Sequence, residues 1–141
     1  MTFSTNQVAE AAQVSLRQLQ WWDERRVVQP DQAGHRRLYD EETFFQVLLV
    51  ARLRSKGASL QRVRTALKSL PLEKLRAQED AVVILRRKGM RICNEEAAVR
   101  AIDLEDGPVW VVAIAPLLQV MRLDQSQKFS ATRIKARIRR T

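Results

Sequence analysis

Two short helix-forming segments close together near the start of the chain are the strongest constraint on its fold. A Ser4 or Thr5 cap begins the first, which we expect to run to about Ala12. After a brief interruption, Ser15 caps a second segment that extends through about Arg25. The spacing predicts two short helices joined by a tight turn, because no single helix can continue through that interruption.

The next stretch predicts two extended segments joined by a turn, followed by two more helices. Residues 27–39 contain an extended segment, turn-forming residues and a returning segment. Asp40 caps a longer helix with a broad apolar face that ends at Gly57. Ser59 caps a further helix, which Pro71 ends. The first half of the chain is therefore expected to be mostly helical.

Beyond Pro71 the pattern changes to β-branched runs. Residues 81–85 and 109–114 are such runs, and residues 90–93 could form a hairpin with the first of them. Asn94 caps a short helix between them. We expect a small α+β module here.

Positive charge is concentrated at the two ends of the chain. The net charge of the 141 residues is +9. Residues 1–70 carry a net +4, residues 71–123 are neutral, and residues 124–141 carry +5. A polyanion such as nucleic acid is therefore expected to contact the first region, the basic tail, or both. The tail could follow DNA as a flexible arm or simply lie in solvent.

The reactive residue types argue against an enzyme and against a bound cofactor. Cys93 is the single cysteine and His35 the single histidine, so neither a disulfide framework nor a metal-ligand cluster is expected. No nucleophile with a matching base, and no glycine-rich phosphate loop, stands out. The N-terminus has no secretion signal and no segment approaches a membrane span, so we expect a cytoplasmic protein associated with the nucleoid.

Several short motifs occur in the order found in one family of DNA-binding proteins. They are Val14-Ser15, Gln18-Leu19-Gln20-Trp21-Trp22-Asp23, Val27-Val28-Gln29-Pro30, Gly34 with Arg37-Leu38-Tyr39, and Leu53 to Leu60. In these residues the chain resembles the MerR-family DNA-binding domain over about its first 70 positions. The resemblance implies a winged helix-turn-helix domain at 1–70, and residues 71–141 lie outside it. Together with the β-branched runs and the basic C-terminal stretch, this predicts a mainly α protein with a small α+β dimerisation or interaction module at 71–123 and a flexible basic tail at 124–141.

The resemblance also implies which side chains meet DNA. It places Leu16 and Arg17 at base edges, where an arginine fork can read guanine. Contacts to the DNA backbone are expected from Ser15, Gln20, Trp21, Arg36, Arg37 and Tyr39. Arg37 and Tyr39 would belong to the wing.

Four departures from the family pattern matter. The family usually has glycine where Gln13 and Arg26 stand, and arginine where Gln20 stands. It has two tyrosines where Trp21 and Trp22 stand. Adjacent helical residues cannot face the same way, so we expect Trp22 in the core and Trp21 as a candidate contact.

The resemblance implies a homodimer bound to a promoter operator, with RNA polymerase as a further partner and distortion of the DNA. Pro71 leaves no room for a long pairing helix, so pairing is expected to use residues 72–85 and 109–123. The candidate interface residues are Trp110, Leu117, Leu118, Val120 and Met121. The same residues could line the module's own core or accept another protein.

Two other functions stay open at this point. The chain could be an interaction adaptor or nucleoid-associated protein whose helix-turn-helix only targets it to DNA, in which case binding would be non-specific. It could also bind RNA through its basic tail, although no paired aromatic strand motif supports this. A sequence-specific transcription regulator accounts for more of the residues.

Overall fold

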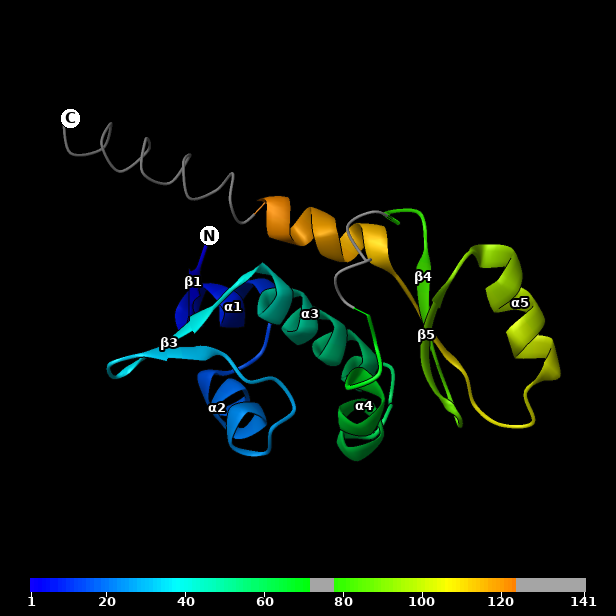
Figure 1. Cartoon of the computed structure of the whole chain (residues 1–141), viewed down its shortest axis with the longest axis horizontal. Coiled ribbons are helices and arrows are strands. Elements are labelled where there is room, and N and C mark those ends of the chain that lie inside the picture. Colours follow the sequence, from blue (N-terminus) through cyan, green and yellow to red (C-terminus); the bar gives the residue numbers. More distant parts are fainter. Residues whose placement is uncertain (72–77, 124–141) are drawn as a thin grey trace.

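The computed structural model describes residues 1–71 and 78–123 (Figure 1). Residues 72–77, which include most of the helix-compatible segment that the sequence predicts at 72–78, and the basic tail at 124–141 lie outside these ranges. In chain order the elements are β1 (Phe3–Ser4), α1 (Thr5–Ala12), α2 (Leu16–Glu24), β2 (Asp31–Ala33), β3 (Arg36–Tyr39), α3 (Glu41–Ser55), α4 (Leu60–Leu67), β4 (Val82–Arg86), β5 (Gly89–Cys93), α5 (Glu95–Leu104) and β6 (Trp110–Ala113). Residues 114–123 form a further helix.

Side-chain caps fix where the helices begin, as the sequence predicts. The Ser4 hydroxyl accepts a hydrogen bond from the Gln7 amide at 3.2 Å and begins α1. The Ser15 hydroxyl accepts from the Gln18 amide at 3.0 Å and begins α2. In both cases the glutamine side chain accepts in return from the backbone amide of the cap, which forms a capping box.

The first sheet contains the wing and one strand that the sequence did not predict. Its strand order is β1-β3-β2, and both pairings are antiparallel. Gly34, with a φ of 65°, makes the tight turn between β2 and β3. The additional strand β1 pairs Phe3 with Tyr39 and so ties the N-terminal segment to the wing.

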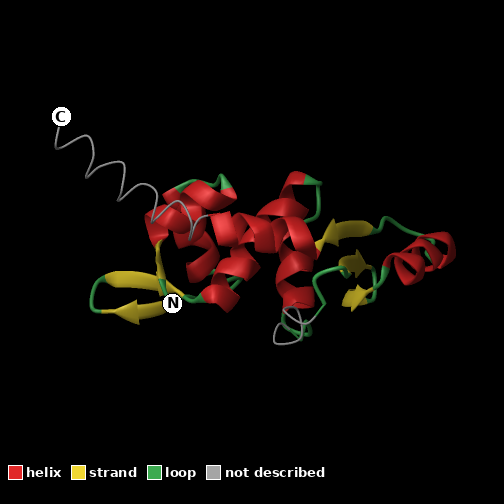
Figure 2. Cartoon of the chain, turned by 90° about the horizontal axis from the view of Figure 1, so that it is seen from above, coloured by secondary structure: helices red, strands yellow, loops and turns green. Residues whose placement is uncertain are grey.

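The second sheet lies between two layers of helix. Its antiparallel strand order is β5-β4-β6. Val83 and Leu85 of β4 face the cluster that includes α3 and α4, whereas Val82 and Ile84 face Ala98 of α5. Figure 2 shows the wing at one end of the molecule, the helices in the middle, and α5 beyond the second sheet.

The expectation of a mainly α fold is wrong. The described residues contain two three-stranded antiparallel sheets in addition to the helices, which makes this an α+β fold. The error arose because the sequence reading gave the second module too little weight and did not detect β1. A strand of two residues has no periodicity of its own, so only its pairing partner defines it.

One hydrophobic core joins the residues on either side of position 71. Buried side chains of α3, such as Leu49 and Leu53, belong to the same cluster as Val83, Leu85 and Ile114. The indole nitrogen of Trp110 in β6 also donates to the Lys56 carbonyl oxygen at 3.1 Å. The second sheet is therefore packed onto the helices instead of being tethered beside them.

None of the helices described within residues 1–71 and 78–123 combines the length and the apolar character that crossing a membrane requires.

Candidate nucleic-acid interface

Helix α2 has one buried face and one exposed face. Leu19 and Trp22 are 1% and 3% exposed and anchor the helix to the core. Leu16 and Trp21 are 52% and 44% exposed, and Arg17 between them is also exposed. The expectation that Trp22 is a core residue and that Trp21 faces outward is confirmed.

The exposed face of α2 forms a shallow hollow of about 630 Å³. It is lined by Ser15, Arg17, Gln18, Gln20, Trp21 and Glu24. Gln20 donates from its side-chain nitrogen to the Glu24 carboxylate at 3.0 Å. The Ser15 hydroxyl is already used as the helix cap. Arg17 is therefore the cation of this face that no described side chain engages.

Arg25 is a functional candidate that the sequence reading missed. Its guanidinium lies 4.4 Å from the centre of the Trp21 ring, a cation–π contact. The two residues are one helical turn apart, and this spacing could have predicted the contact. The stacking holds a positive charge and an indole together on the outward face of α2.

An ion pair ties the wing to α2. Nε of Arg37 in β3 donates to Oδ2 of Asp23 in α2 at 2.7 Å. This hydrogen bond raises the pKa of Arg37 above its ordinary value, and burial opposes it only in part. Arg37 thus links the wing to α2, while its neighbour Arg36 is exposed.

Tyr39, which the resemblance places at the DNA backbone, lies in the core. Its side chain is 1% exposed, beside β1 and α3. Burial raises the pKa of Tyr39 to about 12, with a further contribution from the charge of Asp23. The buried hydroxyl has no hydrogen-bond partner among the described residues. The structure therefore gives Tyr39 a packing role.

The two positions where the family usually has glycine both adopt left-handed backbone. Gln13 follows α1 and Arg26 follows α2, and each has a φ of 57°. This conformation is the one in which glycine carries no steric cost. The turn between α1 and α2 thus has the conformation that glycine favours, although the residue there, Gln13, is not glycine and is strained.

The five candidate pairing residues mostly pack inward. Leu117 and Met121 are each 7% exposed and belong to the shared core. Leu118 and Val120 are partly buried against it. The ring of Trp110 is covered by the Arg62 guanidinium at 5.4 Å from the ring centre. These residues thus lie in or against the shared core, which is one of the alternatives left open by the sequence.

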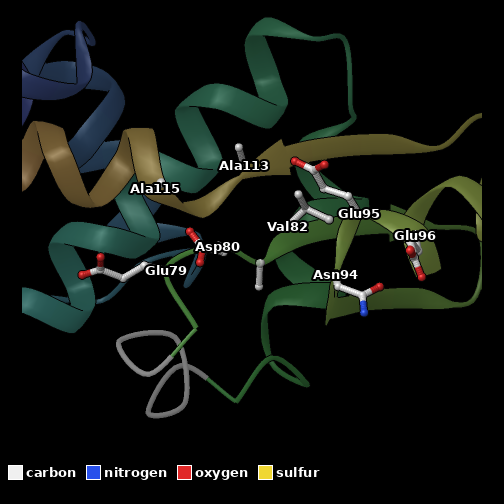
Figure 3. Close-up of a pocket in the computed structure, with 9 residues that line it drawn as sticks. Glu79, Asp80, Val82, Asn94, Glu95, Glu96, Ala113 and Ala115 are labelled. Carbon is white, nitrogen blue, oxygen red and sulfur yellow. The ribbon is translucent and has the colours of Figure 1, made fainter.

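A second hollow, shown in Figure 3, is acidic but does not form a metal site. Glu79, Asp80, Asn94, Glu95 and Glu96 are among its lining residues. Glu79 and Glu96 lie on opposite sides of it in Figure 3, and Glu79 is paired with Arg122. Over residues 1–71 and 78–123, no group of three or more histidine, cysteine or acidic side chains is placed to hold a metal ion.

A helix-turn-helix followed by a β-hairpin wing defines the N-terminal half as a winged helix-turn-helix domain. Residues 3–70 match the family model described as MerR HTH family regulatory protein. The resemblance seen in the sequence is thereby confirmed, and this half of the chain is a MerR-family domain. Over residues 3–70 the chain therefore has the DNA-binding helix-turn-helix domain of this family of regulatory proteins.

Among solved structures, the chain matches the crystal structure of a transcriptional regulator of the MerR family from Bacillus cereus. The two chains are 10% identical, the match covers 99% of this chain and 79% of that one, and the TM-score is 0.47. A comparison with curated proteins gave no match.

Proposed function

We propose that this protein binds a promoter operator in double-stranded DNA sequence-specifically and regulates transcription from it as a homodimer. The observation that carries the proposal is the outward face of α2, where Leu16 and Arg17 stand exposed on a helix anchored by Leu19 and Trp22. A rigid helix with an unengaged arginine near its N-terminus is suited to enter a major groove.

Each exposed side chain has a distinct role in this proposal. Arg17 donates to a guanine edge, and Leu16 makes apolar contact beside it. Trp21 and Arg25, stacked together, lie along the sugar-phosphate backbone, and Arg36 on the wing reaches a second phosphate. Arg37 acts mainly through its ion pair with Asp23, which holds the wing at the angle that this contact needs.

Pairing, distortion of the operator and engagement of RNA polymerase complete the proposal. One α2 helix reads only a few base pairs, so a second copy on an adjacent half-site supplies the length that specific binding needs. Bending or untwisting the DNA between the half-sites would add sequence dependence at positions that the protein does not touch. RNA polymerase would then recognise the distorted promoter.

Selection of bound duplexes from a random library, followed by affinity measurements on variants, tests the proposal. Arg17→Ala should weaken binding to the selected operator by about 1–3 kcal/mol and relax base preference at one position. Arg37→Ala should weaken all sequences to a similar extent, because it loosens the wing. Arg100→Ala removes the same charge from an exposed position on α5 and serves as the control.

If Arg17→Ala lost the same amount of binding affinity for the operator and for random DNA, Arg17 would not contact base edges specifically. If the wild-type protein selected no sequence at all, the alternative of a nucleoid-associated or adaptor protein would replace the regulator. The apolar surface of α5, described next, is the feature that would then serve a protein partner.

A further inference from the structure

Apolar side chains are exposed around a groove at the end of the molecule opposite α2. The groove has a volume of about 630 Å³ and lies between α5, β6 and the helix of residues 114–123. Val99 and Ile102 form its α5 lip, and they are 58% and 47% exposed. Small residues, such as Ala98 and Ala113, also line it.

From this geometry we infer that the groove is the surface on which a second copy of this chain docks. The inference rests on the proposed function, in which two copies of the chain bind adjacent half-sites, and it names the surface through which they pair. Exposed apolar surface of this kind is costly in water unless a partner covers it.

The shape of the surface is self-complementary. The exposed apolar lip on α5, Val99 and Ile102, borders the groove. Under a two-fold rotation, the Val99 and Ile102 lip of each copy can enter the groove of the other. A partner of unrelated shape would leave one of these two features unused.

The charges on the rim of the groove are self-complementary as well. Glu95 stands at the beginning of α5, whereas Arg52 and Lys56 stand at the end of α3, and all three line the groove. None of them forms an ion pair with another residue of the described ranges. A two-fold axis through the groove would bring the acidic side of one copy to the basic side of the other.

The location fits a dimer that binds DNA. In Figure 1, α5 lies at one end of the long axis, and α2 and the wing lie toward the other. Pairing through α5 therefore leaves the exposed face of each α2 uncovered. Leu117 and Val120, two of the five pairing residues expected from the sequence, line this groove, whereas the other three do not.

Sedimentation equilibrium of the full chain tests the surface directly. The wild type should be a dimer, and Ile102→Glu should be a monomer at the same concentration. Leu104→Glu is the matched control, since Leu104 is on the same helix and 84% exposed but does not line the groove. A monomeric wild type, or an Ile102→Glu variant that pairs as well as the wild type, would overturn the inference.

A charge exchange tests the arrangement of the two copies. Glu95→Lys and Arg52→Glu should each raise the dimer dissociation constant about two- to fivefold, and the double variant should restore most of the loss. Glu96→Lys, one position further along α5 and outside the groove, should have no effect. Losses that add in the double variant would contradict the proposed arrangement.

Binding to a duplex with a single half-site separates this inference from the proposed function. Monomeric Ile102→Glu should bind that duplex as the wild-type protomer does, and should lose only the gain from pairing on the full operator. If the wild type and the variant both failed to bind the half-site specifically, the proposed sequence-specific binding by α2 would be wrong. The sedimentation result would still decide whether the groove is the docking surface. Unchanged circular dichroism spectra would show that each variant is folded.

Discussion

The two ends of this molecule expose different kinds of surface. At the α2 end the large apolar anchor Trp22 is buried, and the outward residues include Arg17, Arg25 and Arg36. At the α5 end the outward residues include Val99 and Ile102, and the charged groups stand at the rim. The difference indicates two binding surfaces for two kinds of partner. Exposed cations bind a polyanion such as DNA, whereas exposed apolar side chains are stabilised when a protein partner buries them.

A single core connects the two ends, and this has consequences for stability. Leu53 of α3 and Leu85 of β4 are both fully buried in the same cluster, although residue 71 separates them in the chain. A substitution in the core of the second sheet is therefore expected to lower the stability of the DNA-binding half as well. The first prediction tests whether the two ends unfold as one unit.

Leu85→Ala should have the largest effect on stability. It removes a fully buried side chain at the boundary between the sheet and the helices and should lower the free energy of unfolding by about 2–5 kcal/mol. The measurement is urea unfolding followed by the fluorescence of Trp22, after replacement of Trp21 and Trp110 by phenylalanine, and in parallel by circular dichroism. Both signals should shift together.

Leu104→Ala is the matched control, because Leu104 is 84% exposed, and it should change stability by less than about 0.5 kcal/mol. If Leu85→Ala moved the circular dichroism transition and left the Trp22 transition in place, the two halves would be independent units. The comparison between the ends would then be one between two separate domains.

Asp40→Ala should have an intermediate effect that depends on pH. Burial raises the pKa of Asp40, but hydrogen bonds from Thr43 and nearby backbone amides outweigh it and lower the pKa below its ordinary 3.8. A carboxylate with a lowered pKa in the folded state stabilises above its unfolded pKa, and this contribution is lost as the pH falls through the folded pKa.

The variant should therefore lose about 0.5–2 kcal/mol at neutral pH, which is typical of a lost N-cap. The gap to the wild type should narrow once the pH drops below 3.8. Urea unfolding of both proteins between neutral and acidic pH measures this, with Asp31→Ala as a control at an exposed strand position. A gap that did not change with pH would mean that the carboxylate charge plays no part in the cap.

Gln13→Gly should have the smallest effect, in the stabilising direction. Glycine removes the strain of the left-handed conformation at a φ of 57°, which stabilises the folded state. Glycine also gives the unfolded chain more conformational freedom, which offsets part of this gain. We expect a net gain of about 0.5–1 kcal/mol in thermal or urea unfolding. Gln29→Gly, at a position without positive φ, should be neutral or destabilising. A loss of stability at position 13 would show that the turn is not strained.

The local features of this fold could be predicted from the sequence. The caps Ser15, Asp40 and Asn94 were correctly placed because each acts on backbone only three residues away. The hairpin of β4 and β5 and the outward position of Trp21 also follow from short patterns. The winged helix-turn-helix came from a resemblance spread over several such motifs.

Features that depend on distant partners could not be predicted. Strand β1 exists only because β3 pairs with it, and Tyr39 is buried because that pairing and α3 cover it. The Asp23 to Arg37 ion pair joins a helix to a later strand, and no periodicity links the two. The shared core likewise depends on how the second sheet docks, which single-sequence patterns do not encode.

The central claim is that the exposed face of α2 meets DNA while the α5 end does not. Titrating the isotope-labelled protein with a half-site duplex, and following its backbone amide signals by nuclear magnetic resonance, tests this most directly. We predict that the signals of residues 16–25 and of the wing at 33–37 shift or broaden, and that those of residues 95–104 stay unchanged. Perturbations centred on α5, with α2 unaffected, would contradict the account.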